Sequence, residues 1–129
     1  MAQIETMDVD DYRKLSEKSK YGNKKVTVDG HTFDSIAEAR RYEQLSLMQK
    51  AGAISDLRLQ PRYELQKAFT DNEGKRQRAI EYIGDFSYQE GGLRVVEDCK
   101  GMRTQSYILK KKLFLYRYFD LTFRETKAK

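Results

Sequence analysis

One stretch of the chain constrains the fold more than any other: Val95-Val96-Glu97-Asp98-Cys99-Lys100-Gly101. Its apolar start is typical of a buried strand, and its polar end places an acid, a spacer and a lysine in succession. Side chains at positions i and i+2 of a strand project from the same face, so Asp98 and Lys100 are expected together, opposite Cys99. The stretch therefore predicts a strand that ends with a carboxylate beside a cation.

A second extended segment lies upstream, at residues 80–88, and contains another acid, Asp85. The residues between the two segments, Glu90-Gly91-Gly92, predict a hairpin turn. Two carboxylates on neighbouring strands, with a lysine two residues beyond one of them, are able to hold a hard divalent cation and a water next to a phosphate. We interpret this arrangement as a nuclease site.

The acid-spacer-lysine pattern by itself has a second interpretation. Such triplets occur by chance in charged proteins, and a half-exposed strand edge with a solvated ion pair would show the same residues. The context favours a site, because the apolar run, the upstream acid and the hairpin are followed by a basic helical segment at residues 104–118. The functional interpretation therefore depends on the combination.

The composition is that of one globular domain. The chain has 129 residues and a single proline, and we expect an N-terminal arm at residues 1–19 followed by a domain at residues 20–129. Charged residues make up 35% of the chain, but nine tyrosines and six phenylalanines argue against disorder. A chain of this length buries roughly two-thirds of its unfolded surface, which is enough for one core.

The net charge of +5 and the pI near 9.2 indicate a polyanionic partner, although a solvated basic surface would give the same values. Nucleic acid is expected rather than membrane, because no apolar run is long enough to span a bilayer. The N-terminus lacks the apolar stretch of an export signal, so a cytoplasmic protein is expected. The single cysteine, Cys99, excludes an intramolecular disulfide and cannot build a zinc site by itself.

A helix that carries a third acid is expected early in the domain. Ser35, with Glu38 three residues later, forms a capping-box pattern that predicts a helix at residues 35–51. Glu38 either caps this helix or faces the strand pair as a third carboxylate. Arg40 and Arg41 are expected on the exposed side of the helix.

The remaining segments predict further strands and a second helix. Asp29-Gly30 is a favoured two-residue turn and predicts a small hairpin at residues 26–33. Pro61 interrupts the extended pattern that surrounds it, because proline cannot donate a ladder hydrogen bond. An amphipathic helix with a basic face is expected at residues 104–118. The other expected strands are residues 54–59, 62–69, 78–88 and 121–124.

Several basic residues are candidates for contact with a nucleic-acid backbone. They lie in a basic loop before the first hairpin and in or just before the second helix. Phosphate contact and solubilising surface are both compatible with the loop. The candidate residues are Lys24, Lys25, Arg103, Lys110, Lys111 and Lys112.

The order of these features resembles the PD-(D/E)XK nuclease superfamily, whose members include restriction enzymes and phage-type Holliday-junction resolvases. A closer resemblance, to a small phage-associated family of such nucleases, runs over about residues 20–124. No single motif is specific, but the combination is. The motifs are Phe33-Asp34-Ser35 with Glu38-Ala39-Arg40-Arg41-Tyr42, Leu59-Gln60-Pro61, Gly84-Asp85-Phe86 and Asp98-Cys99-Lys100-Gly101.

This resemblance implies a set of roles for the site residues. Asp85 and Asp98 would bind the metal, Glu38 would complete the metal shell, and Lys100 would position the water or offset charge in the transition state. Gln60 would neighbour the site. The implied cofactor is Mg²⁺, with Mn²⁺ as a substitute, and the implied setting is a phage-encoded protein in a bacterial host.

Two positions need separate comment. Gly84 stands where the superfamily name has proline, but that proline is not a ligand, so the assignments do not change. Glu97 neighbours Asp98, and adjacent residues of a regular strand point to opposite faces, so the i+2 relation to Lys100 selects Asp98. Glu97 would replace Asp98 only if a bulge intervened.

The expected fold is mixed α/β with a restriction-endonuclease-like core, in which helices flank a mixed twisted sheet. The expected function is Mg²⁺-dependent endonucleolytic hydrolysis of DNA. Because a chain this short leaves no added element to read base edges, we expect selectivity for branched DNA such as a Holliday junction. Paired cuts would need a homodimer, arranged by the N-terminal arm or a sheet edge. The alternatives are a non-catalytic DNA-binding module that assists recombination and a packaging-associated nuclease.

Overall fold

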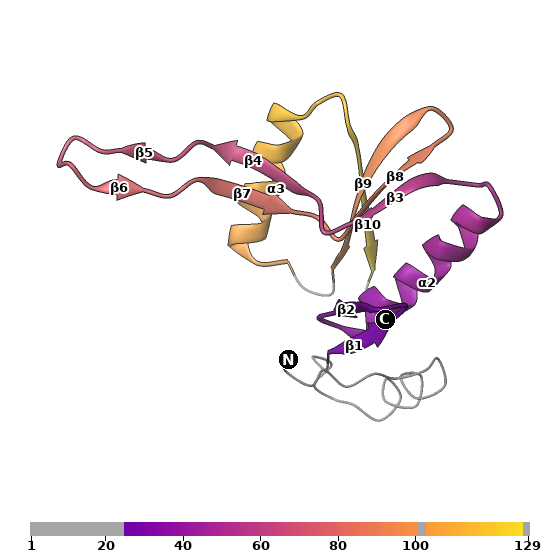
Figure 1. The fold of residues 1–129 in the computed structure, drawn as a ribbon. Helices are drawn as coiled ribbons and strands as arrows, with labels where there is room; N and C mark the ends of the chain where they lie inside the picture. The colour runs from indigo at the N-terminus through magenta and orange to yellow at the C-terminus, as the bar shows by residue number, and fades with distance from the viewer. Residues whose placement is uncertain (1–24, 101–102, 128–129) are drawn as a thin grey trace.

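The computed structural model describes residues 25–100 and 103–127, without the side chains of Lys100 and Lys127. The expected mixed α/β architecture is confirmed, with helices on both sides of a mixed sheet (Figure 1). The N-terminal arm expected at residues 1–19 lies outside the described residues. The elements are β1 (Val26–Val28), β2 (His31–Phe33), α2 (Ile36–Lys50), β3 (Ser55–Leu59), β4 (Arg62–Gln66), β5 (Phe69–Thr70), β6 (Arg76–Gln77), β7 (Ile80–Ile83), β8 (Phe86–Glu90), β9 (Leu93–Lys100), α3 (Gln105–Arg117) and β10 (Thr122–Lys127).

The central sheet has the strand order β10-β9-β8-β3. Strands β8 and β9 form the predicted antiparallel hairpin, with Phe86 opposite Glu97. Its turn requires Gly91 and Gly92, because both have a positive φ, at 56° and 82°. Strand β10 adds to β9 in parallel, and the helix α3 makes the connection between them.

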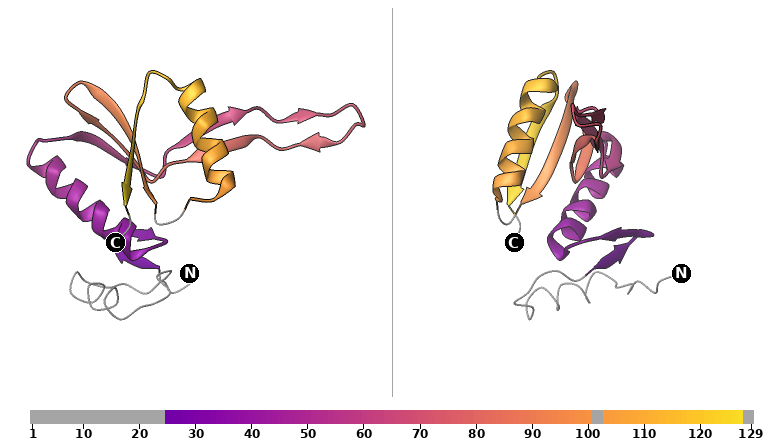
Figure 2. Two further views of the ribbon diagram at one scale, coloured as in Figure 1. Left: turned by 180° about the vertical axis from the view of Figure 1, so that it is seen from behind. Right: turned by 90° about the vertical axis from the view of Figure 1, so that its left-hand side faces the viewer.

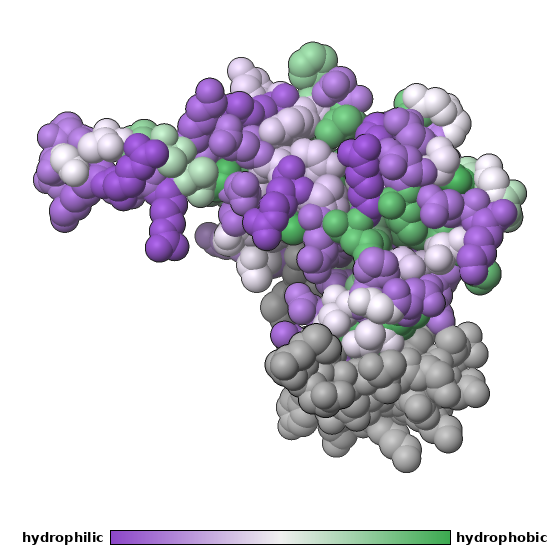
Figure 3. Space-filling view, in the orientation of Figure 1, coloured by the Kyte–Doolittle hydropathy of each residue, from purple (hydrophilic) through white to green (hydrophobic). Residues whose placement is uncertain are grey.

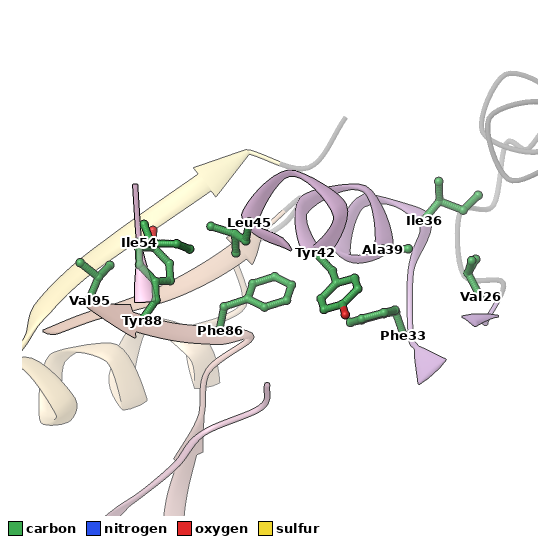
Figure 4. Packing of buried hydrophobic residues seen from close by; sticks show 10 residues of the cluster. All are labelled: Val26, Phe33, Ile36, Ala39, Tyr42, Leu45, Ile54, Phe86, Tyr88 and Val95. Carbon is green, nitrogen blue, oxygen red and sulfur yellow. The ribbon is translucent and has the colours of Figure 1, made fainter. Parts of the chain in front are cut away.

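Helix α2 and the β1–β2 hairpin cover one face of the sheet (Figure 2). The Ser35 side chain accepts a hydrogen bond from the Glu38 amide and begins the helix, as the capping pattern predicts. The buried positions of α2 recur every three residues from Ile36 to Leu45, which forms an apolar stripe. Figure 4 shows Tyr42 and Leu45 of this stripe near Phe86 of β8.

Helix α3 lies on the opposite face and packs against β4 and β7. Thr104 caps its N-terminus by accepting a hydrogen bond from the Tyr107 amide at 3.1 Å. Tyr107 and Phe114 are buried in a second core cluster with Tyr82 and Val96. No helix in the described part of the chain is long and apolar enough to cross a membrane.

A two-stranded antiparallel ribbon, residues 62–83, projects from the body of the molecule (Figure 1). Its turn is built around Asp71, whose carboxylate accepts hydrogen bonds from the amides of Glu73 and Lys75, each at 2.9 Å. The outer end is exposed and largely hydrophilic on the side shown in Figure 3. A continuous strand at residues 78–88 was expected, but this expectation is wrong, because the chain leaves the ribbon at Gly84 and enters the sheet at Phe86.

Candidate functional site

Glu38 takes part in the cap of α2 and also places its carboxyl group near the strand pair. Its amide donates to the Ser35 hydroxyl at 3.1 Å, which is the backbone part of the predicted cap. Its carboxyl group, however, lies close enough to Asp34 and Asp85 for both residues to influence its pKa. The first turn of α2 therefore brings an acid to the strand junction.

Asp85 occupies the junction between the ribbon and the sheet. Its amide donates to the Glu97 carbonyl at 3.0 Å, and its carbonyl accepts from the Gln60 amide at 2.9 Å. Its Oδ2 accepts a hydrogen bond from the Cys99 amide at 2.6 Å. The carboxylate is thus held against the C-terminal end of β9, and the Gln60 backbone lies beside Asp85.

Asp98 is buried on the face of β9 that α3 covers. The Tyr82 hydroxyl donates a hydrogen bond to Asp98 Oδ2. Burial, and then this hydrogen bond, raise the pKa of Tyr82. Sequence reasoning missed Tyr82, because its position against β9 depends on where the ribbon leaves the sheet and not on any local pattern.

The three acids influence one another electrostatically. Burial raises the pKa of Glu38, and the negative charges of Asp34 and Asp98 raise it further. This corner of the molecule therefore favours a bound proton or cation.

The carboxyl groups of Glu38, Asp85 and Asp98 do not form a complete set of metal ligands in this structure. Among the described residues, no group of three or more His, Cys, Asp or Glu side chains is arranged to hold a metal ion. Asp98 instead faces the Tyr82 hydroxyl, while the Asp85 carboxylate accepts the Cys99 amide. The donors are all hard oxygens, which is the ligand type that Mg²⁺ prefers.

Lys100 is the last residue of β9, two positions after Asp98. Its side chain lies outside the described part of the structure. Lys24, a candidate DNA contact, also lies outside it.

Glu97 points away from Asp98, as strand alternation predicts. It is fully buried and accepts two hydrogen bonds from the Arg41 guanidinium, at 2.6 and 2.9 Å. The Tyr88 hydroxyl donates a third at 2.7 Å, and burial followed by this bond raises the pKa of Tyr88 to about 12. The expected exposure of Arg41 and Arg40 is wrong: both are half-buried, because α2 turns Arg41 toward the buried carboxylate.

Gly84 has a structural reason for its identity. Its amide donates to the Pro61 carbonyl at 3.0 Å, a bond that proline could not make. A Cβ at this position would lie 3.1 Å from Val96 Cγ1, so a larger residue would also crowd the sheet. Glycine therefore suits the crossing of the ribbon over β9.

The lysines of α3 do not form one basic face. Consecutive residues are about 100° apart around a helix, so Lys110, Lys111 and Lys112 cannot point the same way. Only Lys112 is exposed, while the other two are half-buried. Lys111 lies 3.5 Å from the Glu125 carboxylate and over the Phe123 ring. The expectation of a three-lysine contact face is therefore wrong.

Arg103 is also engaged within the molecule. Its guanidinium pairs with the Glu125 carboxylate, which in addition accepts a hydrogen bond from the Tyr107 hydroxyl. The Tyr107 bond, and then Arg103, lower the pKa of Glu125. Lys25, just before β1, is exposed. Of the described candidates for phosphate contact, Lys25 and Lys112 are thus the exposed lysines.

Sequence reasoning missed a cationic cleft between the ribbon and β3. It is lined by Arg58, Arg62 and Arg94 together with polar groups of the sheet. Arg94 donates to the Ser87 hydroxyl at 2.8 Å and to Asp56 at 2.7 Å, which fixes its guanidinium. No sequence motif marks these arginines, because Arg58 and Arg94 come from strands β3 and β9 of the sheet and Arg62 comes from the ribbon.

Comparisons with known proteins add a family but no activity. Residues 18–128 match the family described as Protein of unknown function (DUF1064). No curated protein and no solved structure matches the chain. Because the match spans most of its length, the chain belongs to the DUF1064 family.

Proposed function

We propose that this protein is a metal-dependent endonuclease that hydrolyses DNA phosphodiester bonds. The observation that carries the proposal is the convergence of Glu38, Asp85 and Asp98 at the end of β9, from three segments far apart in the sequence. The resemblance of the same residues to the PD-(D/E)XK superfamily supports it. The proposal depends on these site residues and not on the fold, because the α/β fold alone does not imply an activity.

The acids fit the binding of Mg²⁺. Mg²⁺ is commonly held by one or two carboxylates together with waters and substrate phosphates, so Asp85 and Glu38 are sufficient in number. Asp98 would join them on release of Tyr82. When bound, the ion supplies a Lewis acid for the phosphate and lowers the pKa of a water.

The chain itself supplies the orientation of these groups. The Cys99 amide fixes the Asp85 carboxylate, and the Tyr82 hydroxyl holds Asp98. Burial of the Asp98 side chain excludes water from that side of the site. Lys100, as a compact cation, would offset the charge that develops on the phosphate.

The ribbon and the cationic cleft would contact the duplex. Selectivity for branched DNA was expected because no element seemed free to reach a groove, and that premise is wrong, since the exposed ribbon is such an element. A two-stranded ribbon fits the major groove of B-DNA. Shape and phosphate contacts along a ribbon are nevertheless compatible with a preference for junctions, which stays part of the proposal.

The first test measures metal binding without activity. Mg²⁺ should raise the melting temperature of the wild-type protein, because a ligand that binds only the folded state stabilises it by about 2.7 kcal/mol at 100 times its Kd. Asp85→Asn should lose this shift. Asp120→Asn, a change at an exposed acid in the turn after α3, should keep it. A shift of equal size in all three proteins would contradict the assignment of Asp85.

The second measurement is cleavage. Asp98→Asn should still bind DNA but cut it at least about 100-fold more slowly, because a lost metal ligand removes several kcal/mol of transition-state stabilisation. The control is again Asp120→Asn, which should cut at the wild-type rate. A wild-type protein that shifts DNA on a gel but leaves it intact with Mg²⁺ and Mn²⁺ would instead favour the accessory DNA-binding module.

A further inference from the structure

Helix α3 presents an apolar surface on the side that faces away from the sheet. Tyr107 and Phe114 are buried against the ribbon and β9, and no described element covers the opposite side (Figure 2). Exposed fractions on that side run from 39% at Leu113 to 86% at Tyr116. We call this surface the α3 patch, and it comprises Ile108, Leu109, Leu113, Leu115, Tyr116 and Phe119.

The outer side of α3 carries more apolar side chains than that of an ordinary surface helix. A helix that packs on a core normally turns polar residues to solvent. Here the outward arc carries Lys112 as its charged residue, while Lys110 and Arg117 flank the buried stripe. Lys112 lies three or four residues from Leu109 and Tyr116, so the α3 patch is a set of apolar side chains around one lysine, with further cations at its edge.

The size of the α3 patch also fits an interface. Its six side chains expose roughly 800 Å², which is about what one partner contributes to a standard-size complex. The largest apolar patch on a typical monomer is only about 300–600 Å². Burial of this area against a partner would therefore remove an unusually large apolar surface from water.

We propose that the α3 patch is the contact surface between two copies of this chain. Leu109, Leu113 and Tyr116 follow at intervals of four and three residues, so they lie on one line of the helix. A two-fold axis near Leu113 would bring Leu109 of each copy against Tyr116 of the other. The surface is thus complementary to itself, as an isologous dimer requires.

Nucleic acid fits this surface poorly. A helix that contacts phosphates presents several cations outward, but the outward arc of α3 has only Lys112 among its described charged side chains. The apolar side chains around it would lose little water against a phosphate backbone. The observations therefore favour an apolar partner surface, which a second α3 supplies.

The charges of α3 predict how salt affects the dimer. The helix contains lysines and an arginine but no acid, so the cations of two α3 helices that meet repel each other. Added salt screens this repulsion and leaves apolar burial intact. Self-association should strengthen as salt is raised, which is the opposite of the salt dependence of DNA binding.

The test is the mass of the full chain in solution, measured by sedimentation equilibrium at low and high salt. Wild-type protein should form dimers, more tightly at high salt. The double variant Leu109→Gln, Tyr116→Gln should raise the dissociation constant at least about 100-fold, since central interface residues carry most of the binding energy. Leu47→Gln, which changes an exposed leucine on α2, should dimerise like the wild type.

Circular dichroism of each variant shows whether it is folded, which should hold because the substituted side chains are exposed. A monomeric wild-type protein, or a folded double variant that still dimerises, would overturn the proposal. The proposal does not rest on nuclease activity, because mass alone decides it. If the protein is a monomer, residues 1–24 or a different protein would be the alternative partner of the α3 patch.

Discussion

The buried ion pair between Arg41 and Glu97 is the residue-scale feature with the largest expected effect on stability. Glu97 is fully buried, and removal of its cation would leave a desolvated charge with only the Tyr88 hydroxyl. We expect Arg41→Ala to lower the free energy of unfolding by about 3–5 kcal/mol, as measured by urea titration. The exposed pair of Arg62 and Glu81 offers a control.

Arg62→Ala should cost less than about 1 kcal/mol, because exposed ion pairs are screened by solvent. Similar losses in both variants would show that Glu97 gains no more from its partner than a surface acid does. The comparison matters for the site, since Glu97 also accepts the Asp85 amide through its carbonyl. Loss of the ion pair between Arg41 and Glu97 would therefore also make the position of Asp85 less fixed.

At the scale of elements, the ribbon is the part most suited to contact DNA beyond the site. Its strands leave the sheet at Asp85, and ten residues separate Asp85 from Lys75 near the tip. At about 3.3 Å per residue, the ribbon reaches roughly one turn of B-DNA from the acids. A duplex that enters the site could therefore lie along it.

The double variant Arg76→Gln, Arg78→Gln should weaken duplex binding and reduce the slope of log K against log salt by about two units. Both side chains are exposed, so unfolding should be unaffected. Lys50→Gln with Arg117→Gln removes equal charge from the two helices and should leave the slope near that of the wild type. Equal effects of the two variants would mean that net charge, and not the ribbon, determines binding.

At the scale of the whole molecule, the proposed dimer and the proposed chemistry together predict which DNA substrate is preferred. A junction is resolved by cuts on two strands, which two sites in one dimer are able to make together. We expect faster single-turnover cleavage of a four-way junction than of a linear duplex with the same arm sequence. A dimer should also cut both strands of the junction before it dissociates.

Loss of dimerisation in the Leu109→Gln, Tyr116→Gln variant should uncouple the two cuts while single cuts continue. Equal cleavage of junction and linear duplex would favour a general or packaging-associated nuclease. Because the substitutions lie on the outer side of α3, away from the acids, the two results are separable from a loss of chemistry.

The sequence by itself determined the local structure and part of the site. The Ser35 cap, the glycine turn before β9 and strand alternation depend on neighbouring residues, and all three are as predicted. The sequence also determined that the side chains of Glu97 and Asp98 point to opposite faces, because adjacent residues of a strand alternate.

Only the tertiary structure decided which distant groups meet. The carboxyl pair of Glu38 and Asp85 depends on how α2 packs on the sheet, and the bond from Tyr82 to Asp98 depends on where the ribbon crosses β9. Arg41 was expected to be exposed, yet it pairs with Glu97, which is 56 residues away in the sequence. Periodicity and capping act over a few residues, whereas burial of charge is set by packing across the whole fold.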